Sequence, residues 1–104
     1  MNKVHQFTKH IENVLYSTDD RRNIQCETNK RYASFFADLT VTLRSNLAQA
    51  TDILMEIRAA LNGLDLSPTP RDIRNELVAR IENDILKINP NRLAATSSSA
   101  ISSR

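Results

Sequence analysis

The chain contains very few of the residues that form turns. Glycine occurs once, at Gly63, and proline only at Pro68, Pro70 and Pro90. A sheet of short strands needs many turns, and turns are built mainly from these residue types. The sequence therefore predicts an all-α fold.

The length of the chain limits the fold to one domain, and its charge limits the classes of partner. The chain has 104 residues, of which 25% are charged, and a formal net charge of +2. A chain of this size can bury one modest core. Its charge balance does not single out nucleic acid or an anionic membrane as a partner. We expect one helical domain over residues 1–90 and a flexible, serine-rich tail over residues 91–104.

Cysteine content and hydropathy favour the cytoplasm. The single cysteine, Cys26, cannot form an internal disulfide. The first 15 residues lack the uninterrupted apolar stretch of a signal peptide, and no segment has the roughly 18 apolar residues of a membrane helix. We therefore expect a cytoplasmic protein with no membrane contact.

The first helix is predicted from about Asn2 to Tyr16, because apolar residues recur there at intervals of three and four. These residues are Val4, Phe7, Ile11, Val14 and Leu15. Ser17 has an acidic residue three positions later, which resembles a capping box that could start the next helix. The polar segment over residues 19–31 could be the solvated first part of that helix or a loop.

A long central helix is predicted from about Lys30 to Asn62, ending at Gly63. The alternation in LTVTL, residues 39–43, is typical of a strand. Leu39 and Leu43, however, lie on one helical stripe about 120° wide, whereas Val41 points the opposite way. The stripe comprises Tyr32, Phe35, Phe36, Leu39, Leu43, Leu47, Ala50, Ile53, Leu54, Ile57, Ala60, Leu61 and Leu64. LTVTL is therefore predicted to be helical.

The length of this helix predicts an assembly. A continuous helix would be about 50 Å long, well beyond the roughly 30 Å breadth of a compact domain of this size. The two shorter helices would each pack on one end of the long helix, so each cross-section of the molecule would contain only two helices. A second copy of the chain would raise this number to four. We therefore predict an antiparallel bundle of three helices (short, long, short) that forms a homodimer, with parallel or antiparallel pairing left open. The alternative is a break near residues 40–42 or at Ser45–Asn46, which gives a compact four-helix monomer.

The third helix is predicted to follow the connector LDLSPTP. Thr69 is the expected N-cap, with Pro70 at the favoured first position and Asp72 at the third. Its apolar side comprises Ile73, Leu77, Val78, Ile81, Ile85 and Ile88. The helix should end by Asn89–Pro90.

A thinner stripe of small residues lies opposite the main stripe of the central helix. Alanine is a good helix former on any wet surface, but small side chains also let another helix approach closely. Aromatic residues nearby could serve as anchors or could fill the core. The predicted partner or dimer contacts are Tyr32, Phe35, Phe36, Ala37, Val41, Ala48, Met55 and Ala59.

No pattern in the sequence predicts catalysis, a metal or a cofactor. His5 and His10 lie about 140° apart on a helix, so they do not face one metal. Asp52 and Glu56 are interpreted as solvent-facing acids, because an acid–base pair needs a pocket. With one glycine, a phosphate-binding loop is excluded for practical purposes.

Helix-mediated binding remains as the expected function. We predict a non-enzymatic protein–protein interaction module that acts as an adaptor, chaperone or inhibitor of a protein partner. The alternative is a DNA- or RNA-associated regulatory protein whose third helix contacts the bases. The acidic residues Asp72 and Glu76 on that helix disfavour this alternative, because they would repel phosphates. The basic residues for this alternative are Arg21, Arg22, Lys30, Arg31, Arg71 and Arg74.

Overall fold

The computed structural model describes residues 3–92, which are almost entirely helical. The four long helices are α1 (Lys3–Ser17), α2 (Arg21–Ser45), α3 (Leu47–Asn62) and α4 (Pro68–Ile88), and one short helical turn follows at residues 90–92. No strand occurs among the described residues, so the all-α prediction is confirmed. The predicted count of three helices is wrong. Residues 93–104 of the predicted tail lie outside the described residues.

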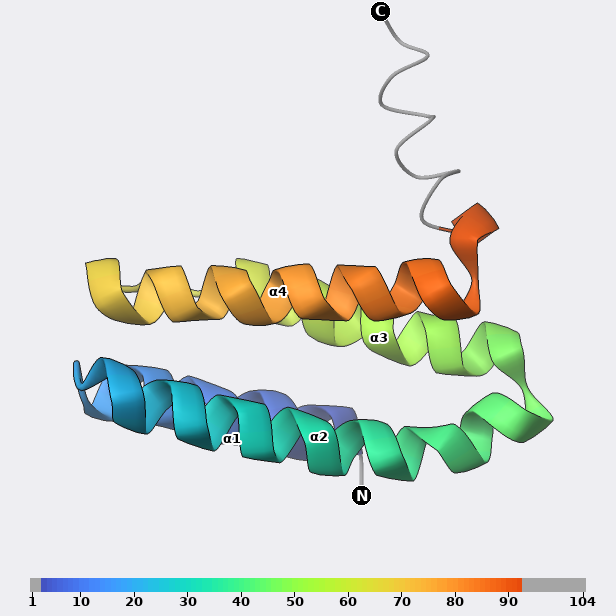
Figure 1. The fold of residues 1–104 in the computed structure, drawn as a ribbon, viewed down its shortest axis with the longest axis horizontal. Coiled ribbons are helices and arrows are strands. Elements are labelled where there is room, and N and C mark those ends of the chain that lie inside the picture. Colours follow the sequence, from blue (N-terminus) through green and yellow to red (C-terminus); the bar gives the residue numbers. More distant parts are fainter. Residues whose placement is uncertain (1–2, 93–104) are drawn as a thin grey trace, which may run out of the picture.

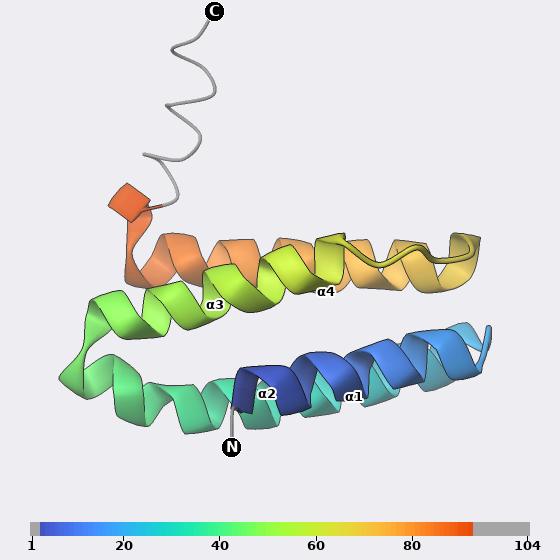
Figure 2. The same cartoon turned by 180° about the vertical axis from the view of Figure 1, so that it is seen from behind.

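The helices form two antiparallel hairpins that face each other (Figure 1). One hairpin consists of α1 and α2, and the other of α3 and α4. The views from both sides place α2 next to α4 and α1 next to α3 (Figures 1 and 2). The connection from α2 to α3 therefore crosses the bundle from one hairpin to the other.

The N-terminal hairpin begins much as the sequence predicts. The predicted first helix corresponds to α1, whose buried residues are Val4, Phe7, Ile11 and Leu15. The polar segment over residues 21–31 is helical and belongs to α2. The cap of α2 is Asp20, whose carboxylate accepts a hydrogen bond from the Asn23 amide at 3.4 Å. The predicted start at Ser17 is wrong, because Ser17 is still the last residue of α1.

The predicted continuous central helix is wrong, and the alternative break at Ser45–Asn46 is confirmed. Asn46 has extended backbone angles, φ −156° and ψ 93°. It caps both helices: its amide donates to the Thr42 carbonyl at 2.7 Å, and its Oδ1 accepts from the Gln49 amide at 3.0 Å. The reversal lets α3 bury its apolar face in the chain's own core. LTVTL is helical, as predicted.

The C-terminal hairpin differs from the prediction at one cap. Helix α3 ends before Gly63, as expected, although Gly63 has a φ of −82° and so does not use left-handed geometry. Helix α4 begins at Pro68 rather than after a Thr69 cap. Proline favours the first helical position, and here Pro68 takes it in place of Pro70. The preceding Ser67 hydroxyl donates to Asp19 at 3.2 Å instead of capping α4.

One core joins all four helices. It comprises Val4, Phe7, Ile11, Leu15, Ile24, Tyr32, Leu39, Ala50, Leu54, Ile57, Leu61, Leu66, Ile73, Leu77, Val78, Ile81 and Ile85. Because the break supplies four helices within one chain, a second copy is no longer needed to give each cross-section enough helices. The homodimer therefore stays a prediction without its original reason.

Candidate functional site

Helix α1 is too short to cover the whole of α2. It has 15 residues against 25 in α2, or about 23 Å against 38 Å at the usual helical rise. Its first turn lies beside the middle of α2, and the far half of α2 extends beyond it toward Asn46 (Figure 2). Among residues 3–92, only three helices therefore contribute to this end of the bundle.

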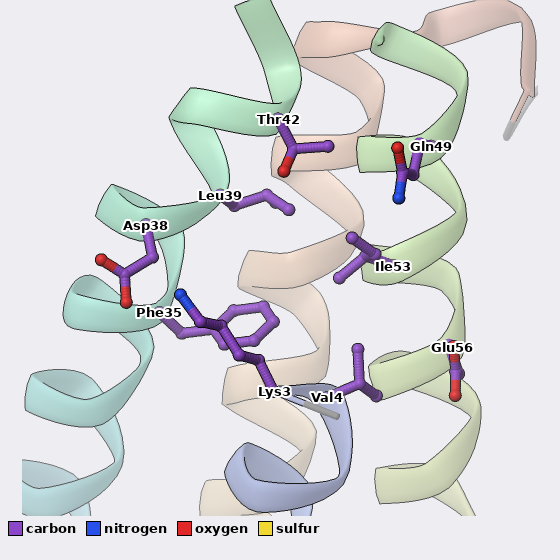
Figure 3. A pocket seen from close by; sticks show the side chains of 9 residues that line it. All are labelled: Lys3, Val4, Phe35, Asp38, Leu39, Thr42, Gln49, Ile53 and Glu56. Atoms are coloured by element: carbon purple, nitrogen blue, oxygen red, sulfur yellow. The ribbon is translucent and has the colours of Figure 1, made fainter. Parts of the chain in front are cut away.

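A groove of about 310 Å³ lies at this end of the bundle, and we call it the end groove. It lies between the C-terminal half of α2 and the N-terminal half of α3, with the first turn of α1 closing one end (Figure 3). Its lining residues are Lys3, Val4, Phe35, Asp38, Leu39, Thr42, Gln49, Ile53 and Glu56.

The floor of the end groove is apolar. The side chains of Leu39, Phe35 and Ile53 converge on its middle, with Val4 at its lower edge (Figure 3). Leu39 and Val4 are buried, whereas Phe35 and Ile53 are only half-buried. The Phe35 ring packs against the Phe7 ring with their centroids 4.6 Å apart. Packing inside the bundle therefore holds the floor in place while part of its apolar surface faces solvent.

The rim of the end groove is polar and charged. Asp38 stands on α2 and Glu56 on α3, so each wall carries one carboxylate, and Lys3 lies on the first turn of α1. Neither Asp38 nor Glu56 belongs to an ion pair within residues 3–92. An apolar floor inside a polar rim is the usual arrangement of a protein-docking surface.

A second groove, the side groove, lies between α2 and α4. Tyr32, Phe36 and Ala37 from the predicted contact set line it, together with Arg80 and Asp84 from α4. The Tyr32 hydroxyl donates to the Asp84 carboxylate at 2.7 Å, and the Arg80 guanidinium lies 5.0 Å from the centre of the Tyr32 ring. Burial and the bond to Asp84 raise the pKa of Tyr32 far above its usual range, against the opposing effect of Arg80. Tyr32 thus ties α2 to α4 rather than offering a free anchor.

The remaining predicted contacts do not form one surface. Val41 is 68% exposed on α2, and Ala48 and Ala59 are exposed on α3. Met55 is half-buried against the core. The break at Asn46 separates Val41 from Ala48, so the thin stripe is divided between two helices. Of the predicted set, only Phe35 lies in the end groove.

The basic residues of the nucleic-acid alternative are scattered and mostly paired. Arg21 contacts Asp72 and Glu76 on α4, at 3.5 and 4.0 Å. Lys30 and Arg31 both contact Glu27. These pairs place acidic groups beside the cations that would meet phosphate.

Arg74 has a structural position. It is only 8% exposed, and its Nη1 donates to the carbonyls of Leu61 and Leu64 at 2.8 and 3.2 Å. It therefore gives the Leu61 carbonyl a second donor beside the Leu64 amide, and it gives a donor to the Leu64 carbonyl just beyond the end of α3. Only Arg22 and Arg71 of the six basic residues are exposed without a partner among the described side chains.

The sequence pattern did not reveal most of the end groove. Its residues belong to the ordinary stripe and its flanks, and with one continuous helix they would not enclose a groove. The difference in length between α1 and α2 is the usable signal, but residues 21–31 have too few apolar side chains to mark that part of α2 as a helix.

Within residues 3–92, no three His, Cys, Asp or Glu side chains are grouped so that they could hold a metal ion. No helix in the same part of the chain has the length and hydropathy to cross a membrane. No protein-family model, curated protein or solved structure matches the chain.

Proposed function

We propose that this chain is a non-enzymatic helical module that binds a protein partner, and that an apolar segment of the partner docks in the end groove. One observation carries the proposal: the half-buried side chains of Phe35 and Ile53 lie in a groove that α1 is too short to cover. Apolar surface in a groove with a polar rim is typical of a binding site.

The shape of the groove favours a helical segment. It continues the line of α1 between two helices, so a docked helix would complete the four-helix cross-section (Figure 3). Such a helix would place apolar residues at intervals of three and four on Leu39 and Ile53. Basic residues along its flanks would meet Asp38 on one wall and Glu56 on the other. An adaptor, a chaperone and an inhibitor would all use this contact, and the identity of the partner decides between them.

Affinity purification from the native host with matched variants tests this proposal. The bait proteins are the wild type, Ile53→Lys in the groove, and Ala79→Lys on the exposed face of α4. We expect a protein that the wild type and Ala79→Lys retain and that Ile53→Lys loses. Calorimetry with that purified protein should then show affinity at least about tenfold weaker for Ile53→Lys, because a buried charge opposes docking. Equal retention by all three baits would remove the end groove as the site.

A DNA-binding measurement tests the nucleic-acid alternative. Fluorescence anisotropy with labelled random-sequence DNA should show no binding at low salt if the protein-binding proposal is right. Binding that weakens steeply as salt rises would indicate contacts with phosphates and would favour the alternative. Arg22→Glu and Arg71→Glu would then be the first variants to measure, because both side chains are exposed.

The compartment and the oligomeric state also remain proposals. Cys26 is a free, exposed thiol, which suits a reducing cytoplasm. Leu47 is 44% exposed at the bend between α2 and α3, and a second copy is one way to cover it.

A further inference from the structure

A single residue reverses the chain between α2 and α3. Ser45 is the last residue of α2 and Leu47 the first of α3, so only Asn46 departs from helical geometry. Its backbone groups nevertheless keep the pairing of a continuous helix. The Asn46 amide donates to Thr42, and the Asn46 carbonyl accepts from Ala50 at 3.1 Å, both four residues apart.

Straightening this connection requires little change. If Asn46 became helical, the amides of Leu47, Ala48 and Gln49 would reach the carbonyls four residues before them, adding three backbone hydrogen bonds. Straightening would break one hydrogen bond, the one that the Gln49 amide donates to Asn46 Oδ1. No glycine or proline lies between residues 21 and 62, so nothing in the sequence forbids a continuous helix.

The apolar stripe also stays in phase through Asn46. Leu39, Leu43 and Leu47 are spaced by four residues, and Ala50 follows three residues later. In the bent form Leu43 is half-buried and Leu47 is 44% exposed. In a straight helix both leucines would continue the buried face of Leu39 and Ala50. The bend therefore leaves partly exposed two side chains that a straight helix would align with the core.

We propose that the chain also forms a domain-swapped dimer. In it, α2 and α3 join into one helix about 63 Å long, and the α3–α4 hairpin of each copy packs on the α1–α2 hairpin of the other. The packing between the two hairpins forms again between copies, so the two forms differ mainly in the backbone at Asn46, and a higher protein concentration favours the dimer. The two straight helices cross near Asn46, and Leu43 and Leu47 of each copy cover those of its partner.

Variants of the connector test the proposal on the purified chain alone. Asn46→Ala removes the capping oxygen and favours helix. Insertion of Gly-Gly-Ser after Asn46 lengthens the turn and prevents a continuous helix, so it favours the bent monomer. Each protein is refolded from urea at several concentrations and its mass measured by sedimentation velocity, with circular dichroism to verify helicity. The wild type should form more dimer at higher concentration, Asn46→Ala should dimerise at a concentration at least about tenfold lower, and the insertion variant should stay monomeric.

A distance measurement separates a swap from ordinary pairing. Spin labels are attached at Ala33→Cys and Ala59→Cys in a Cys26→Ser background, and the labelled chain is refolded with excess unlabelled chain. Both sites are exposed, and they lie 13 residues before and after Asn46. In the bent chain they lie on two antiparallel helices, so the width of the bundle, and not the length of one helix, sets their separation.

In the continuous helix these two positions are separated by about 39 Å along its axis. The dimer fraction should therefore show this long distance and the monomer fraction the short one. A dimer that keeps the short distance overturns the proposal, and so does the absence of a dimer in both the wild type and a folded Asn46→Ala variant.

Discussion

The two ends of the bundle are built from the same helices but differ in how well they are covered. At the end where α1 meets α2 and α3 meets α4, Leu15, Ile24, Leu61 and Ile73 are almost fully buried. At the end near Asn46, Ala50 and Ile85 are also fully buried, but Phe35, Leu43 and Ile53 are only half-buried. The residue types are alike at both ends, and the difference is the presence of α1. Helix length rather than composition thus decides which apolar side chains stabilise the fold and which remain available for binding.

The largest expected effect is at the covered end. Leu15→Ala should lower the free energy of unfolding by about 3 kcal/mol, because it removes a fully buried side chain from close packing and leaves a cavity. Urea unfolding followed by circular dichroism measures this loss. A loss below about 1 kcal/mol would mean that this end is as loosely packed as the other.

Arg74 tests whether polar contacts also stabilise the covered end. Arg74→Ala should cost about 2 kcal/mol, because the Leu64 carbonyl loses its Arg74 donor and the Leu61 carbonyl keeps only the Leu64 amide. The control is Arg71→Ala, an exposed residue three positions earlier, which should change stability by less than about 0.5 kcal/mol. Equal effects in urea unfolding would show that the Arg74 cap contributes nothing specific.

Tyr32 lies between the two ends and gives a pH-dependent test. Tyr32→Phe should cost about 1.5 kcal/mol at neutral pH through loss of the bond to Asp84. Because folding raises the pKa of Tyr32, the folded state holds its proton above about pH 10, where the unfolded state releases it. Stability therefore falls as pH rises above that value, with a contribution from this group of about 1.4 kcal/mol per pH unit.

The same variant supplies the pH control. Tyr32→Phe should lack that alkaline slope when urea midpoints are compared across the alkaline range, with the unfolded state as common reference. An identical slope in both proteins would assign the alkaline effect to other groups.

The smallest expected effect is in the end groove. Ile53→Ala should cost only about 1 kcal/mol or less, because the side chain is half-buried and solvent already reaches the site. The measurement is the same urea unfolding as for Leu15→Ala. A cost equal to that of Leu15→Ala would erase the contrast between the two ends.

Much of the fold follows from residue spacing and caps. The period of Val4, Phe7 and Ile11 predicts α1 almost to the residue, and Asn62–Gly63 and Asn89 mark two helix ends correctly. The start of α2 was harder to place, because residues 21–31 contain few apolar side chains and Asp20 competes with Ser17 as the cap.

The sequence leaves the bend at Asn46 as one of two possibilities for a physical reason. The stripe has the same phase before and after it, and asparagine is acceptable both inside a helix and as a cap. Local sequence preferences are therefore nearly balanced there. The decision rests on the burial of α3 against α1 and α4, which a one-dimensional pattern does not contain. The end groove depends on that decision, so it could not be predicted either.

The position of Lys3 has a practical consequence for anyone who handles the protein. Because α1 starts at the mouth of the end groove, a purification tag or fluorescent protein fused ahead of it would begin beside the space proposed for the partner. An N-terminal fusion could then mimic or block the natural occupant.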